Sequence, residues 1–382
     1  PWDASELWTT SLDVNGDLLK PNKIAGGVAE KNKLISVFQP TWLSTGELVV
    51  AEDSNGWWNL TILENNIRNS KKYKSRYLSS SNIEHGLPQW VSGMRTNCAT
   101  NNYVISMICQ LGLWKLVKYS LKGSAEEINQ PFDDLSALNI DESRLVALAS
   151  NSFKETGLLE IDLQNGEWIH TTSRDNLLNK DQISVAESFW FEGFNGQKTH
   201  AWLYRPTNSS HASLRPLLVK AHSGPTGMAS KGLNYEIQFW TSRGWSVVDV
   251  NYGGSTGFGK SYRERLNEKW GEVDVFDCTA AARTLIDQGK VDQNKIAIEG
   301  GSAGGFTALS CLCFTDVFKV GACRYAVSDL SALVKETHRF EAGYLESLIG
   351  SWKTQPEIYN ERSPLYHSEK IDCPVIFFQG MK

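Results

Sequence analysis

Up to about residue 180, hydrophobic and polar positions alternate in short runs that end at Gly, Asn or Asp, as in β-strands joined by turns. Four stretches repeat this order: "SELWTTSLDVNG", "GWWNLTILENN", "GLWKLVKYSLKG" and "TGLLEIDLQNG". Their anchors recur about 50 residues apart, the period of β-propeller blades; they are Trp8, Trp58, Trp114 and Leu159. Because one blade cannot bury both faces of its sheet, blades stack. We therefore expect an incomplete β-propeller of about three or four blades over residues 1–182, with a β-sandwich as the alternative.

The pattern changes from about residue 183. The stretch "SVAESFWFEGFNGQKTHAWLYRP" predicts a hairpin that turns at Asn195–Gly196. Nearly continuous hydrophobic strands then alternate with helical segments; the strands are "PLLVKA", "WSVVDVN", "KIAIEGG", "FKVGACRYAV" and "CPVIFFQG". Such strands are typical of parallel sheets that are covered on both faces. Residues 183–382 are therefore predicted to form a mostly parallel, doubly wound α/β sheet.

Two helices stand out in this second half. The segment "DVFDCTAAARTLIDQG" places its hydrophobic residues on one helical face, and Gly289 suits the position just after a helix ends. The face consists of Val275, Cys278, Ala282, Leu285 and Ile286. The segment "AGGFTALSCLCF" predicts a second, more hydrophobic helix directly after the strand "KIAIEGG".

Composition and charge exclude several classes of partner. Of 382 residues, 41% are hydrophobic and 21% charged, and the net charge is -5, so neither nucleic acid nor an anionic membrane is an expected partner. No hydrophobic run reaches the roughly 18 residues of a membrane span. The seven cysteines form no Cys-x-x-Cys pair, which favours reduced thiols in a cytoplasmic protein and no metal site. Cys311 and Cys313 are interpreted as packing residues of a hydrophobic helix.

The strand "KIAIEGG" leads into Gly300-x-Ser302-x-Gly304, the pattern of a nucleophile elbow. In that turn the serine backbone is strained so that its hydroxyl stands above the sheet, and side chains two residues before or after would collide. The five-residue pattern is weak alone, but the preceding strand and the following helix strengthen it. A phosphate-binding turn is the alternative, although the sequence has neither Gly-x-Gly-x-x-Gly nor Gly-Lys-Ser/Thr here. Ser302 is therefore the predicted nucleophile.

A second loop supports this interpretation. The tetrapeptide "HSGP" follows the strand "PLLVKA", and in α/β hydrolases the loop at this place supplies one oxyanion-binding N–H while the residue after the nucleophile supplies the other. The predicted donors are the backbone N–H groups of Gly224 and Ala303. His222 is interpreted as a residue that orders the loop, because the base in this fold comes after the nucleophile in sequence.

Five motifs, "HSGP", "NYGGSTGFGKSY", "WGEVDVFDC", "GGSAGG" and "CPVIFFQG", occur in this order. With them the sequence resembles the prolyl oligopeptidase family of serine peptidases, in its acylaminoacyl-peptidase and dipeptidyl-aminopeptidase-like branch. The resemblance implies an α/β-hydrolase domain preceded by a β-propeller, which in the family limits access to short peptides. Ser223 departs from the family, where glycine is usual, and should be tolerated if only the Gly224 N–H is used.

The catalytic triad is expected to be incomplete. In this fold the acid follows the strand "CPVIFFQG" and the histidine lies after one more strand, whereas the sequence stops where the acid would appear. Beyond Ser302 the histidines are His338 and His367, and Asp329 lies where a few hydrolases keep their acid. We therefore expect that the triad Asp and His are not present, that the chain lacks its first blades and its last strand and helix, and that this fragment is nearly inactive by itself.

The expected function of the intact protein is hydrolysis of short peptides, or of N-terminal acylaminoacyl or aminoacyl groups, through an acyl-enzyme on Ser302. No cofactor is expected. Two alternatives stay open. One is a carboxylesterase or lipase with the same elbow, which a propeller-like half disfavours. The other is a binding scaffold whose hydrolase domain is catalytically dead.

Overall fold

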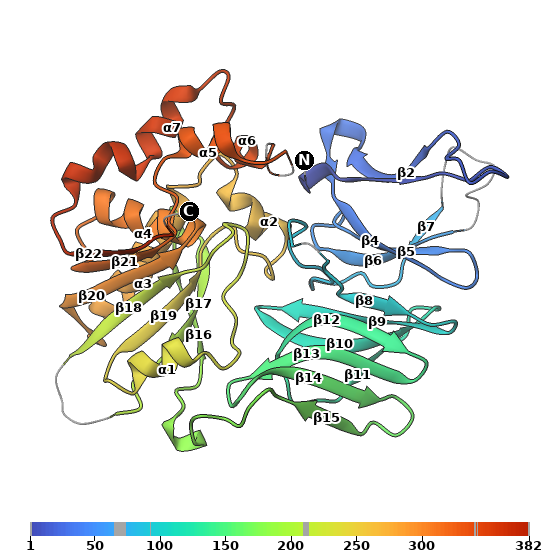
Figure 1. The fold of residues 1–382 in the computed structure, drawn as a ribbon, viewed down its shortest axis with the longest axis horizontal. Helices are drawn as coiled ribbons and strands as arrows, with labels where there is room; N and C mark the ends of the chain where they lie inside the picture. The colour runs from blue at the N-terminus through green and yellow to red at the C-terminus, as the bar shows by residue number, and fades with distance from the viewer. Residues whose placement is uncertain are drawn as a thin grey trace. The chain divides into compact units, whose positions relative to one another are not determined.

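The computed structural model describes residues 2–64, 74–91, 93–208, 214–339, 341 and 343–380. The chain divides into two compact units. The first comprises Pro1–Asn151, Glu155–Asp175 and Gly257–Lys260, and the second comprises Ser152–Lys154, Asn176–Thr256 and Ser261–Lys382. Figure 1 shows the first unit as sheets with short helical turns near the N-terminus, and the second as a sheet with helices.

The N-terminal unit contains four successive antiparallel sheets (Figure 1). The first has three strands, β1 (Glu6–Thr9), β2 (Asn22–Val28) and β3 (Leu34–Ile35). The next has β4 (Val37–Trp42), β5 (Leu48–Glu52), β6 (Asn59–Leu63) and β7 (Ser75–Tyr77). The third has β8 (Asn97–Ala99), β9 (Tyr103–Gln110), β10 (Leu113–Ser120) and β11 (Ala125–Ile128). The fourth has β12 (Asp134–Asp141), β13 (Arg144–Asn151), β14 (Lys154–Asp162) and β15 (Trp168–Thr171).

Strand β5 shows why these sheets stack. Its side chains alternate between the two faces of the sheet, and each face packs in a different hydrophobic cluster. Val49 lies in the cluster that includes Val104 and Val117 of the third sheet. Leu48 and Val50 lie in the cluster that includes Ile24 of the first sheet, so the second sheet is buried on both faces.

The repeat anchors occupy related but unequal places. Trp114 lies in β10 and Leu159 in β14, the third strand of each sheet, while Trp58 lies just before β6. These three side chains are buried. Trp8 differs, because it lies in β1 of the three-stranded sheet and is half exposed.

The C-terminal unit is built on a seven-stranded sheet in the order β16-β17-β19-β18-β20-β21-β22. The strands are β16 (Glu187–Glu192), β17 (Lys198–Tyr204), β18 (Arg215–Ala221), β19 (Ser246–Asn251), β20 (Val291–Gly301), β21 (Val320–Arg324) and β22 (Val375–Phe378). The hairpin β16–β17 and the pair β17–β19 are antiparallel, and all later pairs are parallel. The predicted turn residue Asn195 has a positive φ of 53°.

The helices of this unit are α1 (Tyr235–Thr241), α2 (Lys260–Arg263), α3 (Val273–Asp287), α4 (Ala303–Phe314), α5 (Leu330–Glu336), α6 (Tyr344–Ile349) and α7 (Pro356–Arg362). Short 3-10 turns occur in both units. Those of the first unit are η1 (Trp2–Ala4) and η2 (Glu30–Asn32), and those of the second are η4 (Lys180–Gln182), η5 (Phe194–Gly196), η6 (Glu264–Leu266) and η7 (Pro364–Lys370). The predicted helix ending is confirmed, since Gly289 follows the C-cap of α3 with a φ of 64°.

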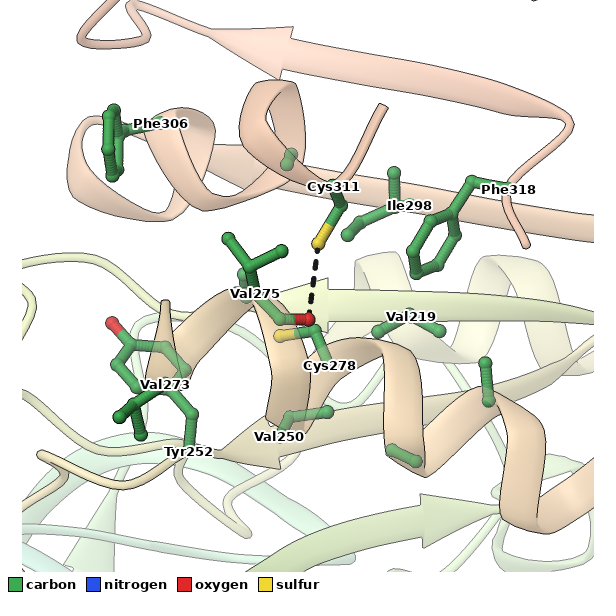
Figure 2. Close-up of a cluster of buried hydrophobic side chains, with 14 of the residues drawn as sticks. Val219, Val250, Tyr252, Val273, Val275, Cys278, Ile298, Phe306, Cys311 and Phe318 are labelled. Carbon is green, nitrogen blue, oxygen red and sulfur yellow. Dashed lines mark hydrogen bonds between the residues drawn. The ribbon is translucent and has the colours of Figure 1, made fainter. Parts of the chain in front are cut away.

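One face of the sheet packs against α3 and α4. Figure 2 shows this core, in which Val219 and Val250 of the sheet face Cys278 of α3 and Cys311 of α4. The Cys311 thiol donates to the Val275 carbonyl at 3.7 Å. All seven cysteines are free, and burial raises the pKa of Cys311 well above its usual value. Cys311 therefore acts as a packing residue, as predicted.

The opposite face, on which α1 lies, carries a row of charges and a hollow. Lys220 of β18 pairs with Glu299 of β20, and Arg324 of β21 lies 3.8 Å from the same carboxylate. Beside this row is a hollow of about 770 Å³. It is lined by Leu218, Tyr235, Glu236, Phe239, Trp240, Trp245, Ala297, Ile298, Glu299, Val320, Gly321, Ala322, Arg324, Ile376 and Phe378. Phe239, Ile376 and Phe378 are each about half exposed.

Candidate active site

Ser302 lies at a sharp corner between β20 and α4. Its φ of 51° and ψ of -119° are a conformation that side-chain-bearing residues rarely adopt. Three backbone bonds hold it there. Its N–H donates to the Arg324 carbonyl at 3.0 Å, and its own carbonyl accepts from the Phe306 N–H at 3.0 Å and the Val327 N–H at 3.3 Å. The residue is partly exposed, and within the described ranges its hydroxyl has no hydrogen-bond partner. The described structure therefore leaves the Ser302 hydroxyl available to a ligand.

The elbow glycines are required by close backbone contacts. A Cβ on Gly300 would lie 2.1 Å from the Gly304 carbonyl oxygen. A Cβ on Gly304 would lie 2.1 Å from the carbonyl oxygen of Ala221 and 2.8 Å from that of His222. The second contact means that the start of α4 presses directly against the end of β18. The backbone of the elbow therefore packs directly against the backbone that leads into the "HSGP" loop.

The two predicted oxyanion donors lie on these two segments. Ala303 is the first residue of α4, where N–H groups have no partner inside the helix. Gly224 has a φ of 62°, and its carbonyl accepts from the Gly227 N–H at 2.7 Å. Among the residues that the structure describes, neither the Gly224 nor the Ala303 N–H donates a hydrogen bond. Both donors are therefore available to a ligand.

His222 orders the loop that carries Gly224. Its Nδ1 lies 3.1 Å from the Ser223 carbonyl and its Nε2 lies 2.7 Å from the Ser255 hydroxyl. The Ser255 hydroxyl in turn donates to the Tyr252 carbonyl at 2.8 Å. The ring stacks on Tyr252 at 4.2 Å. Burial lowers the pKa of His222 to about 4, partly opposed by the bond to Ser223. At neutral pH His222 is a neutral structural group, in agreement with its predicted role.

Two buried carboxylates of α3, which the sequence reasoning missed, accept hydrogen bonds from neighbouring segments. Asp274 Oδ2 accepts from the Thr307 hydroxyl of α4 at 2.5 Å, and Oδ1 accepts from the Gly271 N–H at 2.7 Å. Asp277 accepts from the N–H groups of Gly253 and Phe194, both at 2.7 Å. A usable signal was the motif "WGEVDVFDC", which places two acids at the start of an otherwise hydrophobic helix.

Burial sets the charge state of these carboxylates. It raises the pKa of Asp274 to about 6, and the bonds from Thr307 and Gly271 oppose this shift. It also raises the pKa of Asp277, opposed by the Gly253 and Phe194 N–H groups. Both aspartates are buried. Asp274 bonds to Thr307 of α4, the helix that begins at the elbow, and Asp277 bonds to the backbone of Gly253 and Phe194.

The remaining candidates for a triad do not meet Ser302. His338 lies 3.7 Å from Glu341, and His367 lies 2.9 Å from the Glu361 carbonyl. Asp329 caps α5 by accepting from the N–H groups of Ser331 and Ala332. Over the described part of the chain, no histidine contacts the Ser302 hydroxyl.

Two kinds of feature are absent from the described residues. They contain no group of three or more His, Cys, Asp or Glu side chains that could hold a metal ion. They also contain no helix with the length and hydrophobicity needed to cross a bilayer.

Comparison with known proteins identifies relatives. Residues 231–382 match the model of the prolyl oligopeptidase family. Dipeptidyl aminopeptidase BIII of Pseudoxanthomonas mexicana is 34% identical over 171 residues, which cover 43% of this chain and 25% of that enzyme. Acylamino-acid-releasing enzyme 1 of Oryza sativa subsp. japonica is 28% identical over 179 residues, which cover 44% of this chain and 23% of that enzyme.

Solved structures extend the likeness over the whole chain. A puromycin-hydrolyzing peptidase of Mycobacterium tuberculosis matches 100% of this chain with a TM-score of 0.93 and 32% identity. The chain spans 57% of the length of that peptidase. The second unit is therefore an α/β-hydrolase domain, and the first is a sheet-rich N-terminal region.

Proposed function

Because residues 231–382 are of the prolyl oligopeptidase family, we propose that the whole protein is a serine peptidase that uses Ser302 as its nucleophile. The single observation that carries this proposal is the elbow, where a strained, partly exposed serine stands between two unused backbone N–H groups. The proposed substrates are short peptides and aminoacyl or acylaminoacyl amides. Relatives with these activities in their names support that choice.

The proposed reaction is acyl transfer in two steps. Ser302 Oγ attacks the amide carbonyl while its proton passes to a base, and the carbonyl oxygen becomes negative. The N–H groups of Gly224 and Ala303 would bind this oxygen, and losing one such donor typically costs about 3 kcal/mol in the transition state. The C–N bond breaks as the amine takes the proton, and water then hydrolyses the ester on Ser302. No step requires a metal ion.

The base of this reaction is not assigned. His222 is neutral and directed to Ser255, and His338 and His367 have contacts elsewhere. We propose that the proton of Ser302 passes to another group, and that Ser302 reacts slowly wherever this group is missing. Loss of the base from a serine-histidine pair typically lowers the rate by about a million-fold.

Labelling with a fluorophosphonate probe tests the nucleophile. The whole protein should be labelled at Ser302, and Ser302→Ala should abolish labelling and amide hydrolysis while leaving thermal unfolding unchanged. The matched control is Ser310→Ala, a buried serine of α4 that lies away from the elbow. Labelling of the 382-residue chain as fast as the whole protein would contradict the expected need for a further base.

Substrate kinetics separate the proposed peptidase from its alternatives. Aminoacyl amides, puromycin (itself an aminoacyl amide) and short acyl esters should be compared on the whole protein. We expect turnover of the amides that depends on Ser302. Turnover of esters alone would favour a carboxylesterase, and no turnover of either class would favour a binding scaffold.

For the N-terminal unit we propose that its sheets are blades of a β-propeller. The support is the succession of four antiparallel sheets and the burial of β5 on both faces. A crystal structure of the whole protein tests this arrangement, and sheets that pack as two layers would contradict it.

A further inference from the structure

Ser223 lies in the loop after β18, one residue before the predicted oxyanion donor Gly224. We propose that the Ser223 hydroxyl is a positioning group, which fixes the Gly224 N–H relative to Ser302 and so tunes the oxyanion site. This inference rests on the proposed function. Ser223 is not a catalytic residue in this account, because its hydroxyl acts on the backbone of the elbow.

The supporting contact is direct. Ser223 Oγ donates to the carbonyl oxygen of Gly301 at 2.8 Å, across 78 positions of sequence. Gly301 immediately precedes Ser302, and Ser223 immediately precedes Gly224. One hydrogen bond therefore joins the two segments at the residues next to the nucleophile and next to the predicted donor. A glycine at position 223 has no atom that could make this bond.

The other contacts of the loop hold different points. His222 is held by Ser255, and the turn closes on itself through the bond from the Gly227 N–H to the Gly224 carbonyl. Gly304, which has no Cβ, allows the start of α4 to lie directly against the end of β18. These contacts fix where the loop begins and how it turns. The Ser223 bond is the one described contact in which a loop side chain bonds to the elbow backbone.

The expected consequence follows from oxyanion geometry. A donor stabilises the transition state only when it lies about 2.7–3.1 Å from the oxygen that becomes negative, so a small drift of the Gly224 N–H weakens it. The substrate carbonyl gains most of this charge after binding. Loss of the Ser223 hydroxyl should therefore lower kcat and leave KM unchanged.

The test uses the whole protein and three variants. Ser223→Ala removes the hydroxyl, Ser223→Thr keeps it, and Ser242→Ala is the matched control. Ser242 is also an exposed serine whose hydroxyl donates to a backbone carbonyl, that of Phe239 at 3.0 Å. We expect Ser223→Ala to lower kcat on an aminoacyl amide roughly three- to tenfold at constant KM, which corresponds to one hydrogen bond. Ser223→Thr and the control should stay within about twofold of the wild type.

A second measurement does not depend on turnover. Amide hydrogen exchange of the peptide covering residues 222–227 should be faster in Ser223→Ala and normal in Ser223→Thr. Equal kcat in all variants, or a rise in KM that accounts for the loss, would overturn the proposal. If the wild type itself shows no Ser302-dependent turnover, the proposed function fails, and unchanged exchange in Ser223→Ala would then overturn the positioning role separately.

Discussion

At the scale of single residues, the site depends on the missing side chain of Gly304 as well as on the backbone hydrogen bonds of Ser302. Gly304 has no Cβ, and this allows its backbone to approach the Ala221 carbonyl. Ser302 tolerates a positive φ because its N–H and carbonyl are both bonded to neighbouring backbone. A change at the glycine would therefore act on both segments of the oxyanion site at once.

Gly304→Ala is expected to destabilise the protein by about 3 kcal/mol or more, because a Cβ at 2.1 Å from a backbone oxygen forces α4 away from β18. Urea unfolding followed by circular dichroism measures the loss. Gly289→Ala is the control, since Gly289 has a positive φ but no atom within 4 Å of the added Cβ; it should cost about 1 kcal/mol. Equal losses would show that the close approach has no energetic role.

Residue-level patterns predicted some of these features and missed others. The corner at Ser302, helix 303–314 and the ending at Gly289 depend on neighbours in sequence, so glycine spacing and periodicity were sufficient. The Ser223–Gly301 and Asp274–Thr307 bonds join residues 78 and 33 positions apart, which no local pattern reveals. Strand β20 begins at Val291, before the predicted strand "KIAIEGG". The hydrophobic pattern did not reveal this first part of the strand, because it is polar and largely exposed.

At the scale of elements, α3 and α4 are joined by a hydrogen bond as well as by their hydrophobic faces. Asp274 at the start of α3 accepts from Thr307 in the second turn of α4, and it also accepts from the Gly271 N–H that precedes α3. Its pKa is raised to about 6 by burial. Since the usual value is about 3.9, the folded protein keeps a proton that the unfolded chain releases.

The unfolding free energy should therefore fall as pH rises from about 4 to about 6, by roughly 2–3 kcal/mol from this group, and be constant above that range. Asp274→Asn removes the titration, so its stability relative to the wild type should improve over the same window. Urea unfolding at pH 4, 5, 6 and 7 measures this. Asp287→Asn, at the exposed end of α3, is the control. Parallel profiles for wild type and Asp274→Asn would contradict the assignment.

At the scale of the whole molecule, the strands of the second unit are connected by charges as well as by backbone bonds. Lys220 of β18 lies between Glu299 of β20 and Asp249 of β19. All three residues are buried. Burial raises the pKa of Asp249 to about 7, and Lys220 opposes the shift. Lys220 therefore offsets the negative charge of both buried carboxylates, and Arg324 adds a second cation beside Glu299.

Lys220→Met should destabilise the protein by about 3 kcal/mol, because it leaves the buried Glu299 carboxylate with only the longer contact to Arg324, at 3.8 Å. The double variant Lys220→Met/Glu299→Gln should recover part of this loss. Urea unfolding of the wild type, the two single variants and the double variant gives the coupling free energy between Lys220 and Glu299. Lys115→Met breaks an exposed pair with Glu127 and should cost less than about 1 kcal/mol. A double variant no more stable than Lys220→Met would show that the loss does not come from the unpaired Glu299 carboxylate.

The domain boundary predicted at residue 182 rests on a change that is visible along the sequence, from alternating strands to continuous hydrophobic strands. Contacts assign Gly257–Lys260 to the first unit although this segment lies far along the sequence of the second. A boundary drawn at residue 182 from local patterns cannot detect such an exchange.

The hollow on the α1 face has a practical consequence for anyone who handles this chain. Its aromatic and aliphatic lining, with Phe239, Ile376 and Phe378 about half exposed, is the kind of surface that environment-sensitive dyes adsorb to. Such a dye will fluoresce on correctly folded molecules. A melting curve recorded with it will start from a bright baseline, which should not be misread as damage.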